Sequence, residues 1–224
     1  MFIGHFAPAF AAAALSERSP KLGTLFVAAQ LVDWAFFGLA LAGIEKMRID
    51  PEATAMVPFD LYHMPYTHSL AGSAIFALAF ALVVALWQRN AAGGLIAGAV
   101  VLSHWGLDWL THAPDLTLAG SPPAYGLGLW DYPLVAMPLE IGITLGAFAF
   151  YLARSRGPVG QPLVLVAALV ALQAFNWFAP HPQEAGPGLY IQALVAFGVL
   201  TALAWWAGQN RQRIRRGGLA ARAA

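Results

Sequence analysis

The stretch 68-HSLAGSAIFALAFALVVALWQ-88 is almost entirely apolar and contains no Asp, Glu, Lys or Arg. A bilayer core about 30 Å thick needs about 20 mainly apolar helical residues to cross it, and this stretch has that length and character. Similar runs separated by polar breaks occur at 2–16, 22–44, 91–113, 132–153, 161–178 and 189–208. The sequence therefore predicts about seven transmembrane spans.

The composition of the whole chain agrees with this interpretation. Of the 224 residues 59% are hydrophobic and only 10% charged, whereas an ordinary soluble domain is about 25% charged. Only helices and closed barrels satisfy the backbone in lipid, and the apolar runs lack the alternation of barrel strands. We expect an all-α polytopic membrane bundle with one domain, 1–208, and a basic tail, 209–224. Because the chain has no cysteine, disulfides, thiolate metal sites and a cysteine nucleophile are excluded.

The first run, 2–16, loosely imitates a signal peptide because it ends in 11-AAAAL-15. However, no Lys or Arg precedes it, and more membrane protein follows it instead of a polar mature domain. We therefore expect this segment to be retained as the first span.

Basic residues set the orientation of membrane proteins, since Lys and Arg collect on the cytoplasmic side. In a seven-span arrangement only Lys46 and Arg48 fall on one side. The other side holds Arg18, Lys21, Arg89, Arg154, Arg156, Arg211, Arg213, Arg215, Arg216 and Arg222. We expect an external amino terminus and a cytoplasmic tail in the inner (cytoplasmic) membrane. The tail could instead bind anionic lipid, nucleic acid or a soluble partner, but a topology anchor is the simpler explanation, and no nucleic-acid partner is expected.

The densest polar motif is 103-SHWGLDWLTHAPD-115, at the outer end of the fourth predicted span. His104, Asp108 and His112 follow one another at intervals of four residues, which places them within about 80° of one helix face. Imidazole and carboxylate at one-turn spacing can chelate a metal through N and O donors. The alternative is a His–Asp pair that only joins two helices.

Further candidate ligands come from three other predicted spans. His68 opens the third span in 63-HMPYTHSL-70, His5 lies in the first, and Asp33 lies near the middle of the second. Ionisable groups inside spans are costly and mark functional sites by default, which also singles out Glu140 in the fifth span. We expect His5, Asp33, His68, His104 and Asp108 to form one metal site. Five ligands suit two ions, or one ion with some of these residues orienting the ligands.

These motifs together resemble the YdjM-like family of inner-membrane-associated, metal-dependent hydrolases, also described as LexA-binding. The shared order is Gly4-His5, then Asp33, then 67-THS-69, then 103-SH-104 followed by Asp108. The resemblance covers about residues 1–140. The order of His and Asp ligands is also similar to that of soluble all-helical zinc-dependent phospholipases C. The resemblance implies a divalent metal, zinc above manganese or iron, and hydrolysis of a phosphoester.

A hydrolytic site at this position implies roles for the remaining polar residues. A zinc-type ion activates water and polarises a phosphoryl or carbonyl oxygen. His112 is the candidate for proton transfer to the leaving group, with Glu140 as the alternative base. An external site in the upper membrane favours membrane lipids as partners, with an amphiphilic small molecule or lipid phosphate as the substrate.

Other functional classes remain open at this point. The same polar residues could form the relay of a transporter or proton-coupled channel. Against this, the polar residues gather in the outer halves of the spans, and no inverted repeat is visible. Histidines on facing helices could hold haem, although that chemistry does not need the carboxylates.

Overall fold

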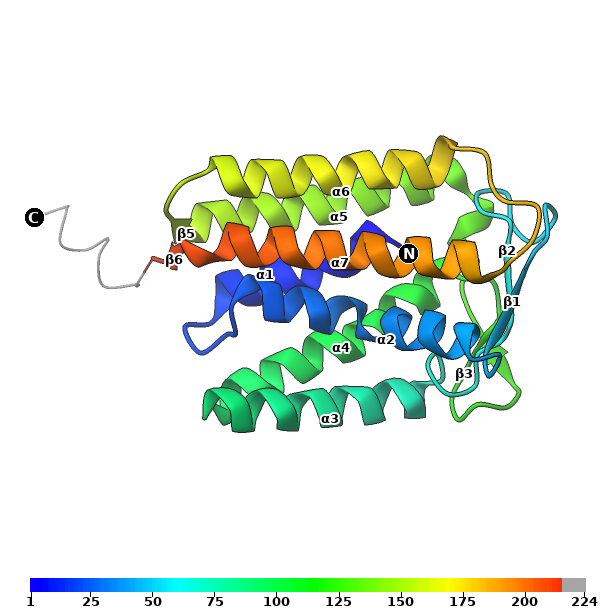
Figure 1. Ribbon diagram of the computed structural model, residues 1–224, viewed down its shortest axis with the longest axis horizontal. Coiled ribbons are helices and arrows are strands. Elements are labelled where there is room, and N and C mark those ends of the chain that lie inside the picture. Colours follow the sequence, from blue (N-terminus) through cyan, green and yellow to red (C-terminus); the bar gives the residue numbers. More distant parts are fainter. Residues whose placement is uncertain (215–224) are drawn as a thin grey trace, which may run out of the picture.

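The computed structural model describes residues 1–214, and within them seven α-helices form one bundle, in which most run along the long axis and α4 runs obliquely to them (Figure 1). A 3₁₀ turn, η1 (Ile3–Phe6), leads into the first helix. The helices are α1 (Ala7–Leu15), α2 (Leu22–Leu41), α3 (Leu70–Gln88), α4 (Ala91–Thr111), α5 (Pro133–Arg154), α6 (Gly160–Phe178) and α7 (Pro187–Gln209). The predicted helical bundle is confirmed.

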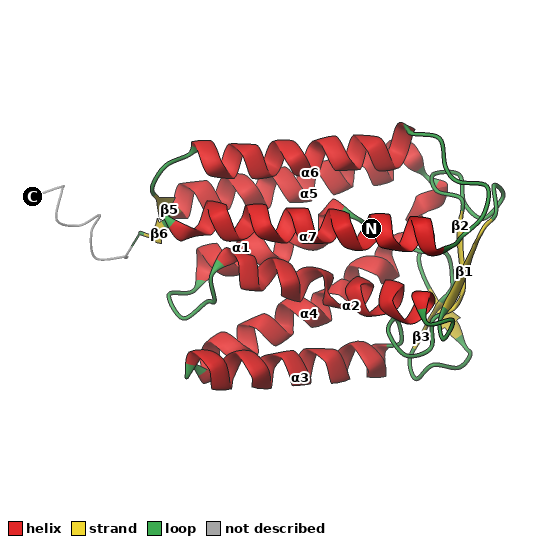
Figure 2. Cartoon of the chain, viewed as in Figure 1, coloured by secondary structure: helices red, strands yellow, loops and turns green. Residues whose placement is uncertain are grey.

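Short antiparallel strand pairs lie at the two ends of the bundle (Figure 2). They are β1 (Lys46–Ile49) with β2 (Phe59–His63), β3 (Leu116–Thr117) with β4 (Ala124–Tyr125), and β5 (Ser155–Arg156) with β6 (Gln212–Arg213). We call the end that carries β1 and β2 the hairpin end, and the end that carries β5 and β6 the basic end. A second 3₁₀ turn, η2 (Leu129–Asp131), precedes α5.

Five of the described helices are long and apolar enough to cross a membrane: α2, α3, α5, α6 and α7. Their outward faces carry large apolar side chains, as in α3, where Leu78 is 71% exposed and Leu86 is 69% exposed. Contiguous exposed apolar surface of this kind suits contact with lipid. Of the seven predicted spans, α1 is too short and α4, which carries the polar motif, is not among the five.

The amino-terminal segment is shorter than a membrane span, although the sequence predicts the first of seven spans at 2–16. The apolar helical segment Ile3–Leu15 is about 20 Å long at 1.5 Å per residue, shorter than a bilayer core. Phe6 and Phe10 are fully buried and pack against Phe26 of α2. Met1 is only 7% exposed, so it lies within the bundle and not beyond its end.

The charge distribution between the two ends matches the pattern expected from the sequence (Figure 1). Lys46 and Arg48 lie on β1 at the hairpin end. The basic end holds Arg18, Lys21, Arg89, Arg154, Arg156, Arg211 and Arg213. Arg215, Arg216 and Arg222 fall outside the described residues. The start of the predicted tail is held in place, because Arg211 donates hydrogen bonds to Ser155 Oγ (3.0 Å) and to the carbonyl oxygen of Gly157 (2.9 Å).

The helix that carries the polar motif is fixed by close packing on its neighbour. Helix α4 begins at an Asn90 cap, whose side-chain oxygen accepts a hydrogen bond from the Gly93 backbone N–H (3.0 Å). Two glycines then face α3: a Cβ at Gly94 would meet the Ala81 carbonyl oxygen, and one at Gly98 would lie 2.8 Å from the carbonyl oxygen of Ala77. Small residues at this interface let the two backbones approach closely.

This packing predicts that Gly94→Ala destabilises the protein although alanine favours helices. The added methyl group would overlap Ala81 and force α3 and α4 apart, at a cost of about 1–3 kcal/mol. We expect a lower midpoint of thermal unfolding in detergent. Gly106→Ala in the same helix is the matched control, because a Cβ there meets nothing within 4 Å, and it should keep or raise the midpoint. Equal midpoints for the two variants would contradict the close packing.

Candidate metal centre

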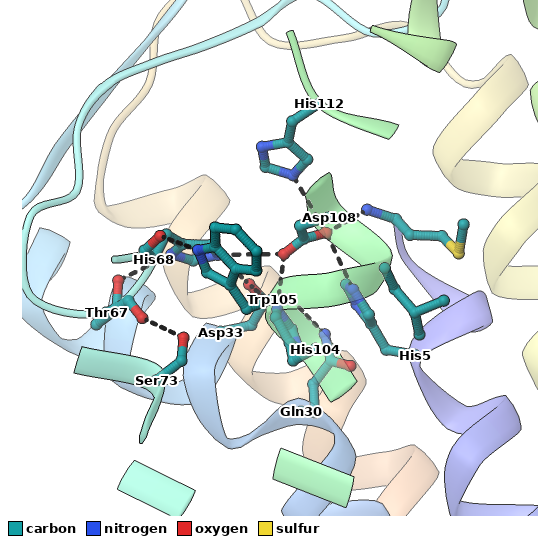
Figure 3. Close-up of polar contacts among 12 residues, drawn as sticks. His5, Gln30, Asp33, Thr67, His68, Ser73, His104, Trp105, Asp108 and His112 are labelled. Carbon is teal, nitrogen blue, oxygen red and sulfur yellow. Dashed lines mark hydrogen bonds and ion pairs between the residues drawn. The ribbon is translucent and has the colours of Figure 1, made fainter. Parts of the chain in front are cut away.

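Four segments bring their polar side chains to one place inside the bundle (Figure 3). His104 and Asp108 come from α4, Asp33 from α2, His5 from η1, and His68 from the segment that precedes α3. Their side chains are buried, with Asp33 the most accessible at 16%. The structure thus brings together all five residues predicted as metal ligands. We call them, with His112, the His/Asp cluster.

Asp108 is the centre of this cluster. Its Oδ1 lies 3.0 Å from His5 Nε2 and 3.2 Å from His112 Nε2. Its Oδ2 lies 3.0 Å from His104 Nε2. The amino nitrogen of Met1 is 2.8 Å from Oδ1. Because His104, Asp108 and His112 are four residues apart, one helix face supplies the middle of the cluster, as the spacing predicts.

Asp33 forms the second carboxylate of the cluster. Its Oδ1 lies 3.3 Å from His68 Nε2 and 3.5 Å from His104 Nε2. Its Oδ2 accepts a hydrogen bond from Gln30 Nε2 at 2.5 Å, one turn earlier on α2. His104 therefore lies between the two carboxylates. His68 precedes α3 and Asp33 lies in the second half of α2, so the two residues come from different segments and meet only through the packing of these helices.

The outer nitrogens of two histidines are held by hydrogen-bond acceptors. His104 Nδ1 is 2.9 Å from the carbonyl oxygen of Ala29, and His112 Nδ1 is 3.0 Å from Asp115 Oδ1. A carbonyl or carboxylate oxygen can only accept, so each Nδ1 carries the proton. In the neutral rings the proton-free Nε2 then points toward Asp108. This is the tautomer in which an imidazole binds a metal through Nε2.

His68 is held in the same tautomer by a longer chain of contacts, which begins at Glu45. The Thr67 hydroxyl donates to Glu45 Oε2 (2.6 Å) and lies 2.8 Å from His68 Nδ1. Since the hydroxyl proton is committed to Glu45, the Thr67 oxygen accepts from His68 Nδ1–H. Glu45 itself is 1% exposed and also accepts the backbone N–H groups of Tyr66 and Thr67. We call this chain, Glu45 to Thr67 to His68, the Glu45 relay.

Glu45 is the residue that sequence reasoning missed. It belongs to the polar connection between two spans and is followed by Lys46 and Arg48, so it has the character of an ordinary loop carboxylate. Its partner is 22 residues away in the chain. No local spacing links the two, whereas the motif 67-THS-69 does contain the threonine and histidine of the relay.

Several buried atoms of the cluster have no hydrogen-bond partner among the described residues: His5 Nδ1 and Nε2, His104 Nε2 and Asp108 Oδ2. His5 Nε2 and His104 Nε2 are close to carboxylate oxygens but not in the direction of a hydrogen bond. Burying polar atoms without a partner is costly, and a cation between His5 Nε2, His104 Nε2 and Asp108 Oδ2 would satisfy these three atoms, leaving His5 Nδ1 to carry the ring proton. The donor set therefore fits a metal ion.

Two groups of three residues have ligand atoms close enough together for each group to hold one ion. One is His5, His104 and Asp108, and the other is Asp33, His68 and His104. Within each group the ligand atoms lie within 4.8 Å of one another. Three protein ligands with one open position are typical of catalytic zinc sites. His112 belongs to neither group, which leaves it free for another role beside the ion.

Glu140, predicted as the alternative base, lines the cavity beside the cluster and is bound by the backbone that carries His5. Its Oε1 accepts hydrogen bonds from the backbone N–H groups of Phe2 (2.6 Å) and Gly4 (3.1 Å). Its Oε2 accepts from Gln173 Nε2 at 3.4 Å, and Gln173 Oε1 accepts from the backbone of Ile3. Glu140 and Gln173 thus anchor the turn that carries His5. These contacts favour a positioning role over that of a base.

A cavity of about 650 Å³ adjoins the cluster, and four of its members, Asp33, His68, Asp108 and His112, form part of its lining. Trp130 stacks on the His112 ring at a centroid distance of 4.2 Å, and Phe36 meets the His68 ring edge to face. His181, from the loop between α6 and α7, also lines the cavity, with its ring against Phe59, and belongs to neither ligand group. The cluster is therefore buried in protein yet reachable from one side.

Comparison with protein-family models, with curated proteins and with solved structures finds no match for this chain.

Proposed function

We propose that the protein is a membrane-embedded, metal-dependent hydrolase of phosphoesters. The observation that carries this proposal is the common orientation of three buried histidines. His68, His104 and His112 each have an acceptor for Nδ1–H. His68 and His104 turn Nε2 toward Asp33 and Asp108, and His112 turns Nε2 toward Asp108. The Met1 amino group, 2.8 Å from Asp108 Oδ1, offsets only part of the negative charge of the two carboxylates. Together with Asp33 and Asp108, the Nε2 atoms of His68 and His104 form the N and O donor set of a zinc-type site, with manganese or iron as alternatives.

The resemblance to YdjM-like hydrolases supports the same proposal. The residues that carry it, His5, Asp33, His68, His104 and Asp108, lie far apart in the sequence and meet in the structure. Thr67 of the motifs also has a structural reason, because its hydroxyl orients His68. A resemblance based on chance spacing would not require this convergence.

The residues around the cluster suit hydrolysis as follows. A bound divalent ion polarises the phosphoryl oxygen and lowers the pKa of water. Water then supplies the oxygen that bonds to phosphorus while the phosphorus–oxygen bond to the alcohol breaks. His112 lines the cavity and is outside both ligand groups, so we assign it the proton transfer: its Nε2 takes the proton that the water loses and passes it to the departing alcohol oxygen. Asp115 and Trp130 hold its ring in place.

Hydrolysis is tested with the purified protein and its His104→Ala variant. Elemental analysis should find about one or two zinc, manganese or iron ions per wild-type chain, without the Soret absorption of haem. Hydrolysis of bis(p-nitrophenyl) phosphate should fall more than about 100-fold on chelation and in the variant, and return on adding metal to the wild type. A protein that holds no metal after attempted reloading would overturn the proposal.

The packing gives the transporter alternative less support. Toward the basic end the core consists of Phe10, Phe26, Phe148, Leu165 and Leu169, all buried and in contact as one apolar cluster. A path across the membrane needs polar groups that continue through this region. Haem also fits poorly, because the His5 and His104 rings stack at 3.7 Å and leave no room for a porphyrin between them.

We further propose that the protein lies in the inner membrane with its basic end in the cytoplasm. Reporter fusions at residue 90 and at residue 224 should report a cytoplasmic location, and an insertion at residue 53, between β1 and β2, an external one. The reason is the surplus of Lys and Arg at the basic end. An external tail would reverse the orientation and place the opening of the site on the cytoplasmic side.

A further inference from the structure

Most of the cavity beside the cluster is lined by apolar side chains. It lies between the halves of α2, α6 and α7 nearest the hairpin end, and β1 and β2 cover it. Its walls are largely aromatic and aliphatic: Phe36, Phe37, Phe175, Trp177, Leu189 and Phe197. Its volume of about 650 Å³ falls within the range of about 300–1,000 Å³ typical of small-molecule sites.

The polar residues of the lining gather mainly at the cluster. Asp33, His68, Asp108, His112 and Glu140 lie at that end, and the lining from α6 and α7 is mostly apolar, with Asn176 and Gln192 as its polar members. A sugar or nucleotide placed against these walls has more polar groups than two amide side chains can bind, so most would lose their hydrogen bonds. A hydrocarbon chain has no such groups, so the walls suit a chain and the cluster suits a small polar head.

The charges of the lining restrict the head group. Among the described residues that line the cavity there is no Lys or Arg, while Asp33, Asp108 and Glu140 are present. A phosphate group would meet carboxylates here unless a divalent ion reversed the local charge. Binding of a phosphate head should therefore depend on the metal, whereas binding of the chain should not.

The lining also reaches the outer surface of the bundle. Phe175 lines the cavity and is 54% exposed. Around it the surfaces of α6 and α7 are apolar, with Phe178 74% and Val195 58% exposed. On the hairpin side, Met47, Val57 and Leu61 are buried and close the cavity with apolar side chains. A chain can thus enter from the bilayer without crossing water.

We propose that this cavity binds the hydrocarbon chain of a single-chain phosphate ester and presents its phosphate to the His/Asp cluster. The position of the head group rests on the proposed hydrolase function, and the chain site rests on the cavity alone. Ala193 and Ala196 of α7 face the cavity with small side chains. A larger side chain at either position would therefore fill the cavity and exclude a hydrocarbon chain.

The probe for the test is dodecyl phosphate that carries a photoreactive diazirine at the end of its chain. With metal-loaded protein in detergent, cross-links should map to residues 172–179 and 189–197 and should saturate. Filling the cavity with Ala193→Trp or Ala196→Trp should reduce saturable labelling about tenfold, as expected for overpacking. Ala202→Trp is the matched control, since Ala202 is exposed on the same helix and is not in the lining.

The outcomes separate the chain site from the enzyme activity. Metal content and thermal midpoint of the tryptophan variants show whether they fold. Saturable cavity labelling in a protein without metal or hydrolysis would support the chain site and reject the hydrolase. Labelling that never saturates and spreads over exposed faces such as that of α3 would overturn the chain site, even if water-soluble phosphoesters are hydrolysed. Unlabelled dodecyl phosphate and farnesyl phosphate as competitors distinguish a linear chain from an isoprenyl chain.

Discussion

The Asp108→Asn variant is expected to bind no stoichiometric metal. Both oxygens of this carboxylate face imidazole nitrogens, with His5 at 3.0 Å, His104 at 3.0 Å and His112 at 3.2 Å. Asparagine keeps the shape but removes the charge and replaces one acceptor by a donor. Loss of an orienting residue beside a metal ligand already lowers affinity about 10–100-fold, so loss of the shared carboxylate should exceed about 100-fold. Competition with a chelator of known affinity measures it.

The controls for this variant separate metal loss from misfolding. His104→Ala should give the same result, because His104 belongs to both groups of possible ligands. His63→Ala, at an exposed position, and His181→Ala, outside both ligand groups, should keep their metal. Equal metal loss in all four variants, together with a lost thermal transition, would indicate general unfolding and not a metal site.

The Glu45→Gln variant is expected to weaken metal binding about 10–100-fold, although Glu45 touches no predicted ligand. The amide oxygen can still accept the backbone N–H groups of Tyr66 and Thr67, which Oε1 accepts now. The amide nitrogen would then face the Thr67 hydroxyl and donate to it. That hydroxyl would turn its proton to His68 Nδ1, so the proton of the ring would move to Nε2 and block the lone pair that faces Asp33.

Substitutions of Thr67 test the Glu45 relay independently and include a conservative variant that should restore metal binding. Thr67→Val removes the hydroxyl and should weaken metal binding to a similar degree, whereas Thr67→Ser keeps it and should restore binding. A Co²⁺-substituted sample gives a second readout, because its absorption bands report the number of ligands. If Glu45→Gln and Thr67→Val lower only the thermal midpoint, with unchanged affinity and spectrum, the relay is structural and does not orient His68.

The sequence predicted much of the fold because each helix is specified locally. The predicted run 132–153 corresponds to α5 (Pro133–Arg154), and 161–178 corresponds to α6 (Gly160–Phe178). In an apolar surrounding the backbone of a single segment must make its hydrogen bonds within that segment. A run of apolar residues without strand alternation therefore forms a helix. The exception is the first run, which forms a short buried helix because its aromatic residues pack against α2.

The candidate site was only partly predictable for the same reason. The three residues of α4 share a face because of helical periodicity, which the sequence contains. By contrast, Glu140 is an ionisable residue within a span, which suggests a base, but it anchors the backbone of Phe2 and Gly4. Glu45 lies in a polar connection, which suggests an ordinary loop residue, but it orients a candidate ligand through Thr67. Neither role can be derived from neighbours in the chain, because each depends on residues more than 20 positions away.

The sequence is therefore sufficient to predict the helical bundle and the concentration of basic residues at one end. It also identifies the candidate ligands His5, Asp33, His68, His104 and Asp108. These follow from composition and from spacing within single segments. The tertiary structure alone decided that these ligands meet, that their rings are held by Ala29, Asp115 and the Glu45 relay, and that an apolar cavity adjoins them. Convergence depends on helix tilt and on side-chain packing between distant segments, which no local pattern records.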